Sequence, residues 1–390
     1  MKLLIYANDW APTVGGVQTL VTLLAGGLAG WGRTHGGEQV EVTLATQTPA
    51  GTMDDSSLPY RVVRRPGAGE LFRLIRLSDA VHIAGPCLLP SAIALLLRKP
   101  AVIEHHGYQA VCPNGLLFKE PSRRVCSGHF AERRYSECLR CCSSTMGRTS
   151  GLRAVLLTFP RRWLSRRLAV NIMVTDHVGA RLNLPRSRTI YHGIEDVPQA
   201  GPAESPSAST PLEIAYVGRL VAEKGLPLLL EAAKKLKERG VAFRLSMIGN
   251  GPQLQELRQL ARDLVLGDLV TFTGDLRGAE LETMVNKIAV VVMPSVWEET
   301  AGLSAIEQMM RGRAVIVADI GGLGEVVDGA GMKFEPGDVR ALVSCIQRLA
   351  GDPAFARSLG SAARERAMRF FRHDSMIRAH LALYWEVSIR

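Results

Sequence analysis

The stretch AVVVMPSVWEETAGLSAIEQMMRG, residues 289–312, joins an apolar run to a segment with helical spacing of apolar residues. The run predicts a buried parallel strand, and the remainder predicts a helix that begins near Gly302. Similar runs alternate with helical segments along the whole chain. They are KLLIYA, VEVTLAT, AVHIAG, AVIEHH and VNIMVT in the first half, and LEIAYVG, FRLSMIG, VTFTG, AVVVMP and AVIVAD in the second. This alternation predicts an α/β fold with parallel sheets covered on both faces.

The chain of 390 residues is long enough for two domains of similar size. Residues 196–211, DVPQAGPAESPSASTP, lack periodicity and are predicted to be a linker between two doubly wound units. We expect Rossmann-like domains at 1–195 and 212–370 that face each other across a cleft, where ligands of such sheets bind. Residues 107–150 are predicted to be a cysteine-rich insertion on the first domain, and residues 371–390 a final helix.

The positive charge of the chain, +10 in total, lies in its first half. Residues 1–195 hold 24 lysines and arginines against 13 acidic residues, and residues 148–188 hold nine arginines and one acid, Asp176. Such a patch attracts the phosphates of lipid headgroups, nucleic acid or an anionic substrate. Nucleic acid is the least favoured, because no binding motif or set of interleaved aromatics accompanies the arginines.

The arginine-rich segment LLTFPRRWLSRRLA, residues 156–169, places Phe159, Trp163 and Leu164 among two arginine pairs. This pattern suits the headgroup layer of an anionic membrane; alternatively, Trp163 and Leu164 are the buried face of an ordinary helix and the arginines are solvated. The opening MKLLIYANDW has too short an apolar core for a signal peptide, and no apolar stretch approaches the roughly 18 residues of a membrane span. We expect a cytoplasmic protein that binds peripherally to the membrane.

Four of the seven cysteines lie in or near one polar excursion: Cys112, Cys126, Cys138 and Cys141. Thiols in this number suit a structural zinc ion, but only one C-x2-C pair is present and the outer spacings are irregular. A reducing compartment argues against a disulfide framework. The alternatives are therefore a structural zinc site and reduced free thiols.

The residues that follow AVVVMP have the features of an anion site. A helix that begins there directs the N–H groups of Gly302, Leu303 and Ser304 outward, and glycine lets a ligand approach the backbone closely. Glu299 precedes the helix start and Glu307 lies inside the helix. Carboxylates accept hydrogen bonds from vicinal hydroxyls, so an anion flanked by two polyols fits the arrangement. A sugar joined through a diphosphate to ribose is such a ligand.

Two further loops follow predicted strands of the second half. In YVGRLVAEKG, Arg219 and Lys224 would complete a diphosphate clamp, although an exposed basic pair is the ordinary alternative. In MIGNGPQLQEL, Gly249 and Gly251 suggest a dinucleotide turn. Leu254 stands where the third glycine of that fingerprint belongs, so the fingerprint fails.

Together these segments resemble the retaining glycosyltransferases of family 4, which have the two-domain GT-B fold. The resemblance rests on GRLVAEKG, on PSVWEETAGLSAIE with its E-x7-E spacing, on GGLGE and on GGV near the amino terminus, and it covers essentially the whole chain. It implies that the final helix crosses back onto the first domain. It also implies that the loop of Gly249 and Gly251 borders the nucleotide.

The family's residue roles carry over to the matching positions. Arg219 and Lys224, next to Gly218, match the residues that hold the donor's diphosphate. Glu299 matches the glutamate that contacts hydroxyls of the donor sugar, and Glu307 matches the one that holds the ribose. These implied roles make Arg219, Lys224 and Glu299 candidate catalytic residues.

The first half carries the remaining matches. HGYQAVCP is similar to a family segment whose histidine enters the cleft near the transferred sugar, which implies this role for His106, whereas His105 would point the other way along the strand. Gly15 and Gly16 match the family's amino-terminal glycine loop, which implies a place beside the donor. The chain departs from the family at Ala301, where many members have an aromatic residue, and at His192, where asparagine is usual.

We therefore expect a metal-independent transferase that moves a hexose from a UDP- or GDP-linked sugar to an acceptor with retention at the anomeric carbon. The acceptor is expected to be a sugar, a lipid-linked sugar or a polysaccharide precursor, with an anionic membrane as a further partner and no nucleic acid. No cofactor is expected to be required for catalysis. The alternatives are a sugar-nucleotide epimerase or phosphorylase on the same fold, and a non-catalytic sugar-nucleotide-binding protein.

Overall fold

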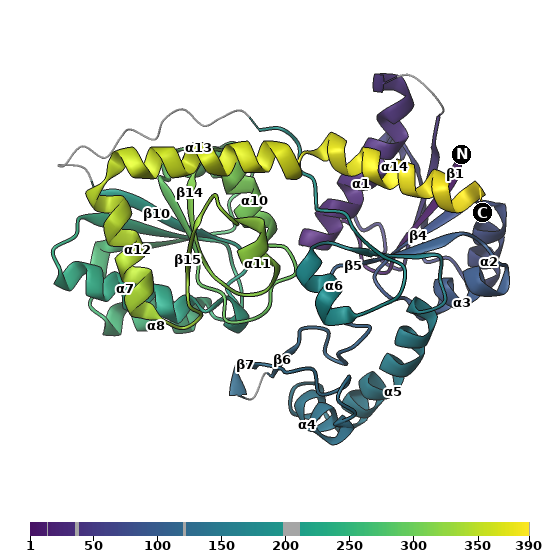
Figure 1. The fold of residues 1–390 in the computed structure, drawn as a ribbon, viewed down its shortest axis with the longest axis horizontal. Coiled ribbons are helices and arrows are strands. Elements are labelled where there is room, and N and C mark those ends of the chain that lie inside the picture. Colours follow the sequence, from purple (N-terminus) through teal and green to yellow (C-terminus); the bar gives the residue numbers. More distant parts are fainter. Residues whose placement is uncertain (14, 36–38, 120–121, 198–210, 390) are drawn as a thin grey trace. The chain divides into compact units, whose positions relative to one another are not determined.

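Figure 1 shows a computed structural model of the chain, which describes residues 1–13, 15–35, 39–119, 122–197 and 211–389. The predicted linker 196–211 lies almost wholly outside these residues. The chain divides into two compact units. The first comprises residues 1–121, 126–195 and 371–390, and the second comprises residues 122–125 and 196–370.

The first unit is built on one parallel sheet. Its strands are β1 (Lys2–Ala7), β2 (Glu41–Thr46), β3 (Arg61–Arg64), β4 (Ala80–Ala84), β5 (Ala101–His105), β8 (Val170–Met173) and β9 (Ser187–Thr189). Their order in the sheet is β3-β2-β1-β4-β5-β8-β9. The helices are α1 (Gly16–His35), α2 (Ala68–Leu77), α3 (Leu88–Leu96), α4 (Tyr135–Met146), α5 (Arg148–Ser165), α6 (Asp176–Leu182) and α14 (His373–Ile389), with a 3-10 turn η1 (Asp55–Ser57) and a short strand pair β6 (Phe118–Lys119) and β7 (Arg124–Val125).

The second unit repeats this plan. Its strands are β10 (Leu212–Val217), β11 (Phe243–Ile248), β12 (Val270–Gly274), β13 (Val290–Met293), β14 (Ala314–Ala318) and β15 (Met332–Phe334), in the order β12-β11-β10-β13-β14-β15. The helices are α7 (Leu226–Glu238), α8 (Leu254–Asp263), α9 (Gly278–Lys287), α10 (Leu303–Met310), α11 (Gly321–Val326), α12 (Val339–Gly351) and α13 (Pro353–Phe370), with 3-10 turns η3 (Ala222–Lys224) and η4 (Gly267–Leu269).

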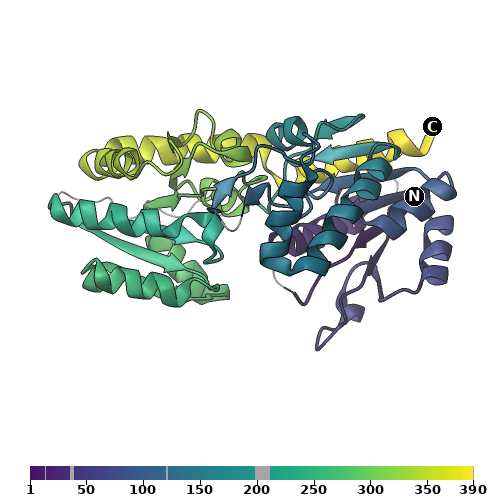
Figure 2. The same cartoon turned by 90° about the horizontal axis from the view of Figure 1, so that it is seen from below.

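All ten apolar runs form strands, and helices lie on both faces of each sheet (Figures 1 and 2), so the predicted α/β fold is confirmed. Parallel strands buried on both faces need continuous apolar sequence, and β4, β5, β8, β13 and β14 are almost entirely buried. In the described part of the chain, no helix has both the length and the apolar character that crossing a membrane demands.

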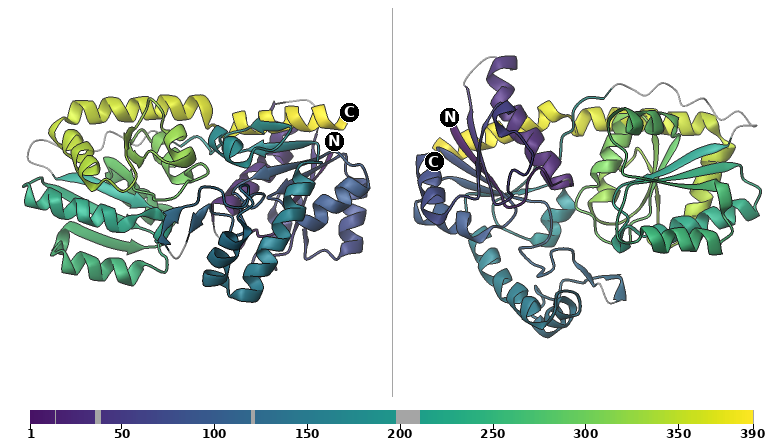
Figure 3. Two further views of the ribbon diagram at one scale, coloured as in Figure 1. Left: turned by 60° about the horizontal axis from the view of Figure 1, so that its bottom comes forward. Right: turned by 180° about the vertical axis from the view of Figure 1, so that it is seen from behind.

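The final helix, α14, belongs to the first unit and packs beside α1 (Figures 1 and 3). Its buried side chains join the hydrophobic core under β1, β2 and α1, where Ile377, Tyr384 and Leu28 are fully buried. The core of the first unit is therefore completed by the last residues of the chain.

Candidate functional site

Both sheets have a strand order that reverses direction at a defined point. In the second unit this point lies between β10 and β13, and in the first unit between β1 and β4. Loops that leave neighbouring strands in opposite directions open a crevice at the carboxyl ends of the strands, where ligands of such sheets bind. The predicted site residues follow these four strands or their neighbours.

In the second unit, the loops after β10 and β13 bring two predicted residues together. Lys224 Nζ lies 2.8 Å from Glu299 Oε2, and the two side chains are only 15% and 4% exposed. Ser295 donates a short hydrogen bond to the other carboxylate oxygen of Glu299. This is a buried, fully paired carboxylate, so neither charge of the pair can be removed without leaving the other unpaired.

The amino terminus of α10 adjoins this pair. Gly302 caps the helix in a left-handed conformation (φ +76°), and a Cβ atom built there would lie 3.8 Å from Glu299 Oε2 and would collide with Leu323. The first N–H groups of a helix have no intrahelical acceptor, so those of Leu303 and Ser304 are donors for an anion. Glu299 therefore lies next to a helix terminus that attracts negative charge.

The other two charged residues of the predicted donor site lie further out. Arg219 is 69% exposed, and its Nη2 atom lies 3.7 Å from Glu223. Tyr216 fixes the Arg219 backbone by donating a hydrogen bond of 2.7 Å to its carbonyl oxygen. Glu307 is half-buried on α10, and burial raises the pKa of its carboxyl group, although Arg311 acts to lower it. No described contact joins Arg219 to the Lys224–Glu299 pair, so these residues do not form a single network.

The glycines after β10 and β11 pack the backbone closely. A Cβ atom at Gly249 (φ +128°) would lie 2.1 Å from the carbonyl oxygen of Gly218, and one at Gly251 would lie 2.3 Å from that of Leu220. These glycines let the two loops touch at the carboxyl edge of the sheet. A side chain at Gly249 or Gly251 would therefore collide with the neighbouring backbone, so the fold alone explains glycine at both positions.

Sequence reasoning assigned no role to the loop after β14, although GGLGE was part of the family resemblance. The N–H group of Gly322 donates a hydrogen bond of 2.6 Å to the carbonyl oxygen of Glu299. A Cβ atom at Gly321 would lie 2.5 Å from that same oxygen. The two glycines thus hold the backbone of Glu299 in place.

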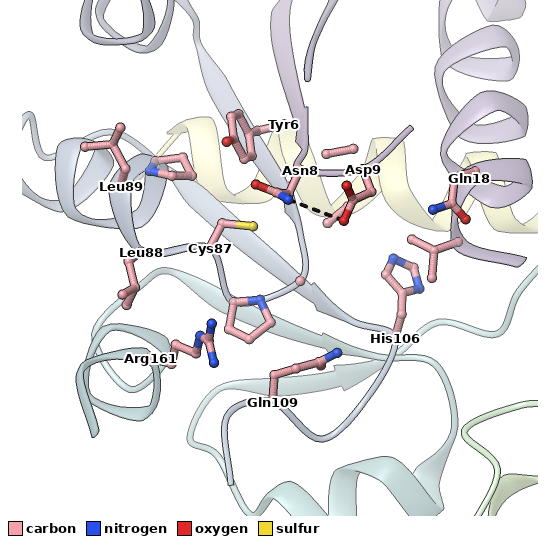
Figure 4. A pocket seen from close by; sticks show the side chains of 16 residues that line it. Tyr6, Asn8, Asp9, Gln18, Cys87, Leu88, Leu89, His106, Gln109 and Arg161 are labelled. Atoms are coloured by element: carbon pink, nitrogen blue, oxygen red, sulfur yellow. Dashed lines mark hydrogen bonds between the residues drawn. The ribbon is translucent and has the colours of Figure 1, made fainter. Parts of the chain in front are cut away.

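The first unit contains a pocket of about 500 Å³ at the ends of β1, β4 and β5. Figure 4 shows His106 and Gln18 on one side of it and Cys87 and Arg161 on another. Asn8 and Asp9, which follow β1, also line the pocket and are joined by a hydrogen bond of 3.3 Å. Gly15 and Gly16 lie just before Val17 and Gln18, which line the pocket, but neither glycine is among its lining residues.

The three histidines considered from the sequence have different surroundings. His105 donates from Nε2 to Asn171 Oδ1 at 2.9 Å, and burial lowers its pKa to about 4, so it is a buried structural residue that points away from the pocket, as predicted. His106 lines the pocket, and its ring stacks on that of His192 with centroids 5.5 Å apart. Burial lowers the pKa of His106 and lowers that of His192 to about 3.

Behind His106 lies a cluster that sequence reasoning missed. Glu104 Oε2 is 3.5 Å from His106 Nε2 and 3.2 Å from His82 Nε2, and Glu104 Oε1 is 3.9 Å from His380 Nε2. The members come from β4, β5 and α14. His82 and Glu104 interrupt the apolar strands AVHIA and AVIEH, which is the signal that the sequence offered.

The cysteines of the insertion are partly gathered. The Cys112 thiol donates to Asn114 Oδ1 at 2.9 Å, and Asn114 Nδ2 donates to Cys141 Sγ at 3.6 Å, so an amide group stands between these two sulfurs. Burial raises the pKa of Cys112 to about 11 and that of Cys138 to about 12. Among the described residues, the three-residue groups whose donor atoms lie within 4.8 Å of one another contain no cysteine. Cys126 is also a buried free cysteine. A zinc ion bound by these cysteines stays a prediction.

One face of α5 is apolar and exposed. Leu152, Leu156, Phe159 and Trp163, at helical spacing, are 49%, 57%, 43% and 49% exposed. Leu164 is buried, so it is not part of this exposed face. Two of the four neighbouring arginines have other contacts. Arg161 lines the pocket of the first unit, and Arg162 donates a hydrogen bond to the carbonyl oxygen of Leu182. Arg166 and Arg167 are exposed.

Comparison with known proteins identifies the second unit. Residues 200–366 match the family model of the glycosyl transferases group 1. The chain is 30% identical over 217 residues to the 2-deoxystreptamine glucosyltransferase of Streptomyces kanamyceticus, an alignment that covers 51% of this chain and 56% of the relative. The chain thus spans a little over half the length of this relative.

Solved structures share the architecture of the whole chain. Sucrose-phosphate synthase from Thermosynechococcus elongatus superposes with a TM-score of 0.72 at 22% identity, covering 99% of this chain and 98% of that one. Anabaena HepE in complex with UDP-glucose superposes with a TM-score of 0.71 at 16% identity, covering 99% of this chain and 100% of that one. The chain therefore has the GT-B fold, and residues 200–366 of its second unit are similar to the glycosyl transferases group 1.

Proposed function

We propose that the protein is a retaining glycosyltransferase that moves a hexose from a nucleoside diphosphate sugar to an acceptor. The observation that carries the proposal is the Lys224–Glu299 pair, 2.8 Å apart, beside the amino terminus of α10 at the point where the second sheet reverses its strand order. A cation, a helix terminus and a carboxylate side by side suit a ligand that joins a diphosphate to a polyol.

In this proposal the second unit binds the donor. Lys224, Arg219 and the first amide groups of α10 hold the diphosphate and stabilise the charge that develops on it as it departs. Glu299 accepts hydrogen bonds from hydroxyls of the donor sugar, and Glu307 from those of the ribose. Arrival of the donor would therefore exchange the internal contacts of Lys224 and Glu299 for contacts with the ligand.

The transfer step is proposed as a displacement on one face of the sugar. The bond from the anomeric carbon to the diphosphate oxygen breaks, the acceptor hydroxyl oxygen forms the new bond on the same face, and its proton passes to the departing diphosphate. No covalent sugar–enzyme intermediate is formed. In this proposal His106, which lines the first unit's pocket, contacts the transferred sugar.

Because cationic side chains and a helix terminus offset the diphosphate charge, catalysis is proposed to need no divalent ion. Treatment with EDTA is expected to leave the initial rate of transfer unchanged in protein that remains folded. The measurement is the rate of nucleoside diphosphate release with and without the chelator. Loss of activity that Mg²⁺ or Mn²⁺ restores would contradict a metal-independent transfer.

UDP is the first nucleotide to test, because a structural relative has been solved with UDP-glucose; GDP is the second. A thermal-shift screen of nucleoside diphosphates distinguishes the bases, since a ligand of the folded state raises the melting temperature. Release of the nucleoside diphosphate that depends on added acceptor then identifies a transferase. Release without acceptor, or binding without turnover, would instead indicate an epimerase, a phosphorylase or a non-catalytic binding protein.

We also propose that the acceptor is lipid-linked and that α5 meets an anionic membrane. The exposed apolar face of Leu152, Leu156, Phe159 and Trp163 is continued by the exposed Arg166 and Arg167. The Arg167 guanidinium lies 3.9 Å from the centre of the Trp163 ring. An apolar helix face with flanking arginines fits the boundary between acyl chains and anionic headgroups.

Changing both Arg166 and Arg167 to glutamine is expected to weaken binding to anionic vesicles by about tenfold or more, because each basic residue near such a surface contributes roughly 1 kcal/mol. Co-sedimentation with phosphatidylserine-containing vesicles at low salt measures this effect. The matched control is Arg73→Gln with Arg76→Gln, which removes the same charge from exposed positions on α2. An equal loss in both double variants, or equal binding of the wild type to neutral vesicles, would end the membrane proposal.

A further inference from the structure

The cluster behind the pocket of the first unit is a set of metal-ligating side chains with no access to solvent. His82 and His380 are 0% and 1% exposed, and Glu104 is 4% exposed. The donor atoms of these three residues all lie within 4.8 Å of one another. They come from β4, β5 and α14, so three segments far apart in the sequence direct them to one point.

Hydrogen bonds to the far side of each imidazole orient the ring. His380 Nδ1 lies 2.9 Å from the carbonyl oxygen of Met376, which can only accept, so Nδ1 carries the proton and Nε2 has the lone pair. His82 Nδ1 lies 2.8 Å from the hydroxyl of Tyr384, which can either donate to this nitrogen or accept from it. Both Nε2 atoms face the Glu104 carboxylate: His82 Nε2 lies 3.2 Å from Oε2, and His380 Nε2 lies 3.9 Å from Oε1. Metal-ligating histidines are typically held by a hydrogen-bond partner on the second nitrogen.

The charge of Glu104 needs a counter-charge. No lysine or arginine forms an ion pair with Glu104 in the described part of the chain; its partners are His82, His106 and His380. A buried carboxylate that faces an imidazole lone pair, as Glu104 faces that of His380, is costly unless a cation lies between them.

We propose that His82, Glu104 and His380 bind a divalent transition-metal ion through His82 Nε2, His380 Nε2 and a carboxylate oxygen of Glu104. The separations of 3.2 Å and 3.9 Å between the nitrogens and the carboxylate fit ligands of one ion, because bonds of about 2.0–2.2 Å place two ligand atoms roughly 3–4 Å apart. Two imidazoles and one carboxylate suit Zn²⁺ or Fe²⁺, whereas Mg²⁺ and Ca²⁺ prefer oxygen ligands.

The proposed ion has a structural role. His380 lies on α14, whose side chains complete the core of the first unit, while His82 and Glu104 lie on the two central strands β4 and β5. An ion bound to all three would fasten the last helix of the chain to the sheet. The role is independent of the proposed glycosyl transfer, in which the departing diphosphate is stabilised without a metal.

The first test is the metal content of purified full-length protein after extensive dialysis, measured by elemental analysis. We expect one transition-metal ion per chain in the wild type and its loss in Glu104→Gln and His380→Gln. Two controls remove the competing ligands. His192→Gln alters the neighbouring group of Glu104, His106 and His192, and Cys138→Ser with Cys141→Ser alters the cysteines of the insertion. Both controls are expected to retain the ion.

A second readout uses the wild type alone and serves if the buried variants do not fold. Protein loaded with Co²⁺ in place of the native ion is expected to show the visible absorption of nitrogen and oxygen ligands without a thiolate-to-cobalt band. Removal of the ion by a strong chelator is expected to lower the melting temperature, and Zn²⁺ to restore it. A wild type that binds no transition metal, an ion lost only with the cysteines or with His192, or a thiolate band as the sole cobalt signal would each overturn the proposal.

Discussion

Replacing Lys224 by methionine is expected to slow glycosyl transfer by about a hundred- to a thousandfold, because removal of one charge-stabilising donor at a departing anion typically has an effect of that size. Lys224 lies beside Glu299 at the crevice of the second sheet, where the diphosphate would be held. The measurement is kcat/KM for acceptor-dependent release of nucleoside diphosphate. A variant that retains most of its activity would remove Lys224 from the donor site.

The same substitution has a second consequence, for stability. Methionine leaves the buried Glu299 carboxylate without its cation, which is expected to reduce the free energy of unfolding by about 3–5 kcal/mol. The double variant Lys224→Met with Glu299→Gln removes both charges and should recover much of this loss while staying inactive. Denaturant unfolding of the two single variants and the double variant gives the coupling energy. If the two losses simply add, the pair is not coupled in solution as it is in the structure.

Glu307→Gln is expected to weaken nucleotide binding by about ten- to a hundredfold, the size of a lost charge-assisted hydrogen bond. It is also expected to stabilise the free protein at neutral pH. Burial raises the pKa of Glu307 in the folded state, so the native protein is penalised for ionising this group. Calorimetry with the preferred nucleotide and unfolding of the free protein measure the two effects separately.

The effect of Glu307→Gln on stability is expected to depend on pH. The contribution of Glu307 to stability is greatest below the ordinary pKa of a carboxyl group and is lost as the pH rises through the raised pKa. Glutamine abolishes that dependence, so the variant and the wild type should differ little at acid pH and increasingly above it. Glu365→Gln, at an exposed position on α13, is the matched control and should change neither binding nor the pH profile. Destabilisation by Glu307→Gln at neutral pH would contradict the assignment.

The fold was predictable because its central strands are buried on both faces. Such strands need uninterrupted apolar sequence, and most of the ten runs recognised from the sequence are of this kind, whereas β12 lies at a sheet edge and is only partly buried. Apart from the two-residue strands β6 and β7, three strands among the described residues escaped recognition: β3, β9 and β15. They are three or four residues long, and β9 is exposed at every position, so they have neither the length nor the pattern on which periodicity depends.

The residues proposed for the donor side of the candidate site were named for a different reason. Lys224 and Glu299 are far apart in the sequence, and the family resemblance named them both, but only the tertiary structure shows that they form an ion pair. The family resemblance did not point to His82, Glu104 and His380. Each lies in an element identified by its apolar neighbours, and their convergence depends on strand order and on the return of α14, which local sequence does not encode.

The return of α14 to the first unit also bears on how the chain is made. On a ribosome the strands of the first unit emerge first, yet Ile377, Leu381 and Tyr384, which cover their core, follow only after the second unit has been translated. At a translation rate of roughly 5–20 residues per second, the core of the first unit stays exposed for about 10–40 s before this helix is synthesised. During that interval the nascent first unit presents apolar surface to other chains and to chaperones, while the second unit can fold as soon as it leaves the exit tunnel.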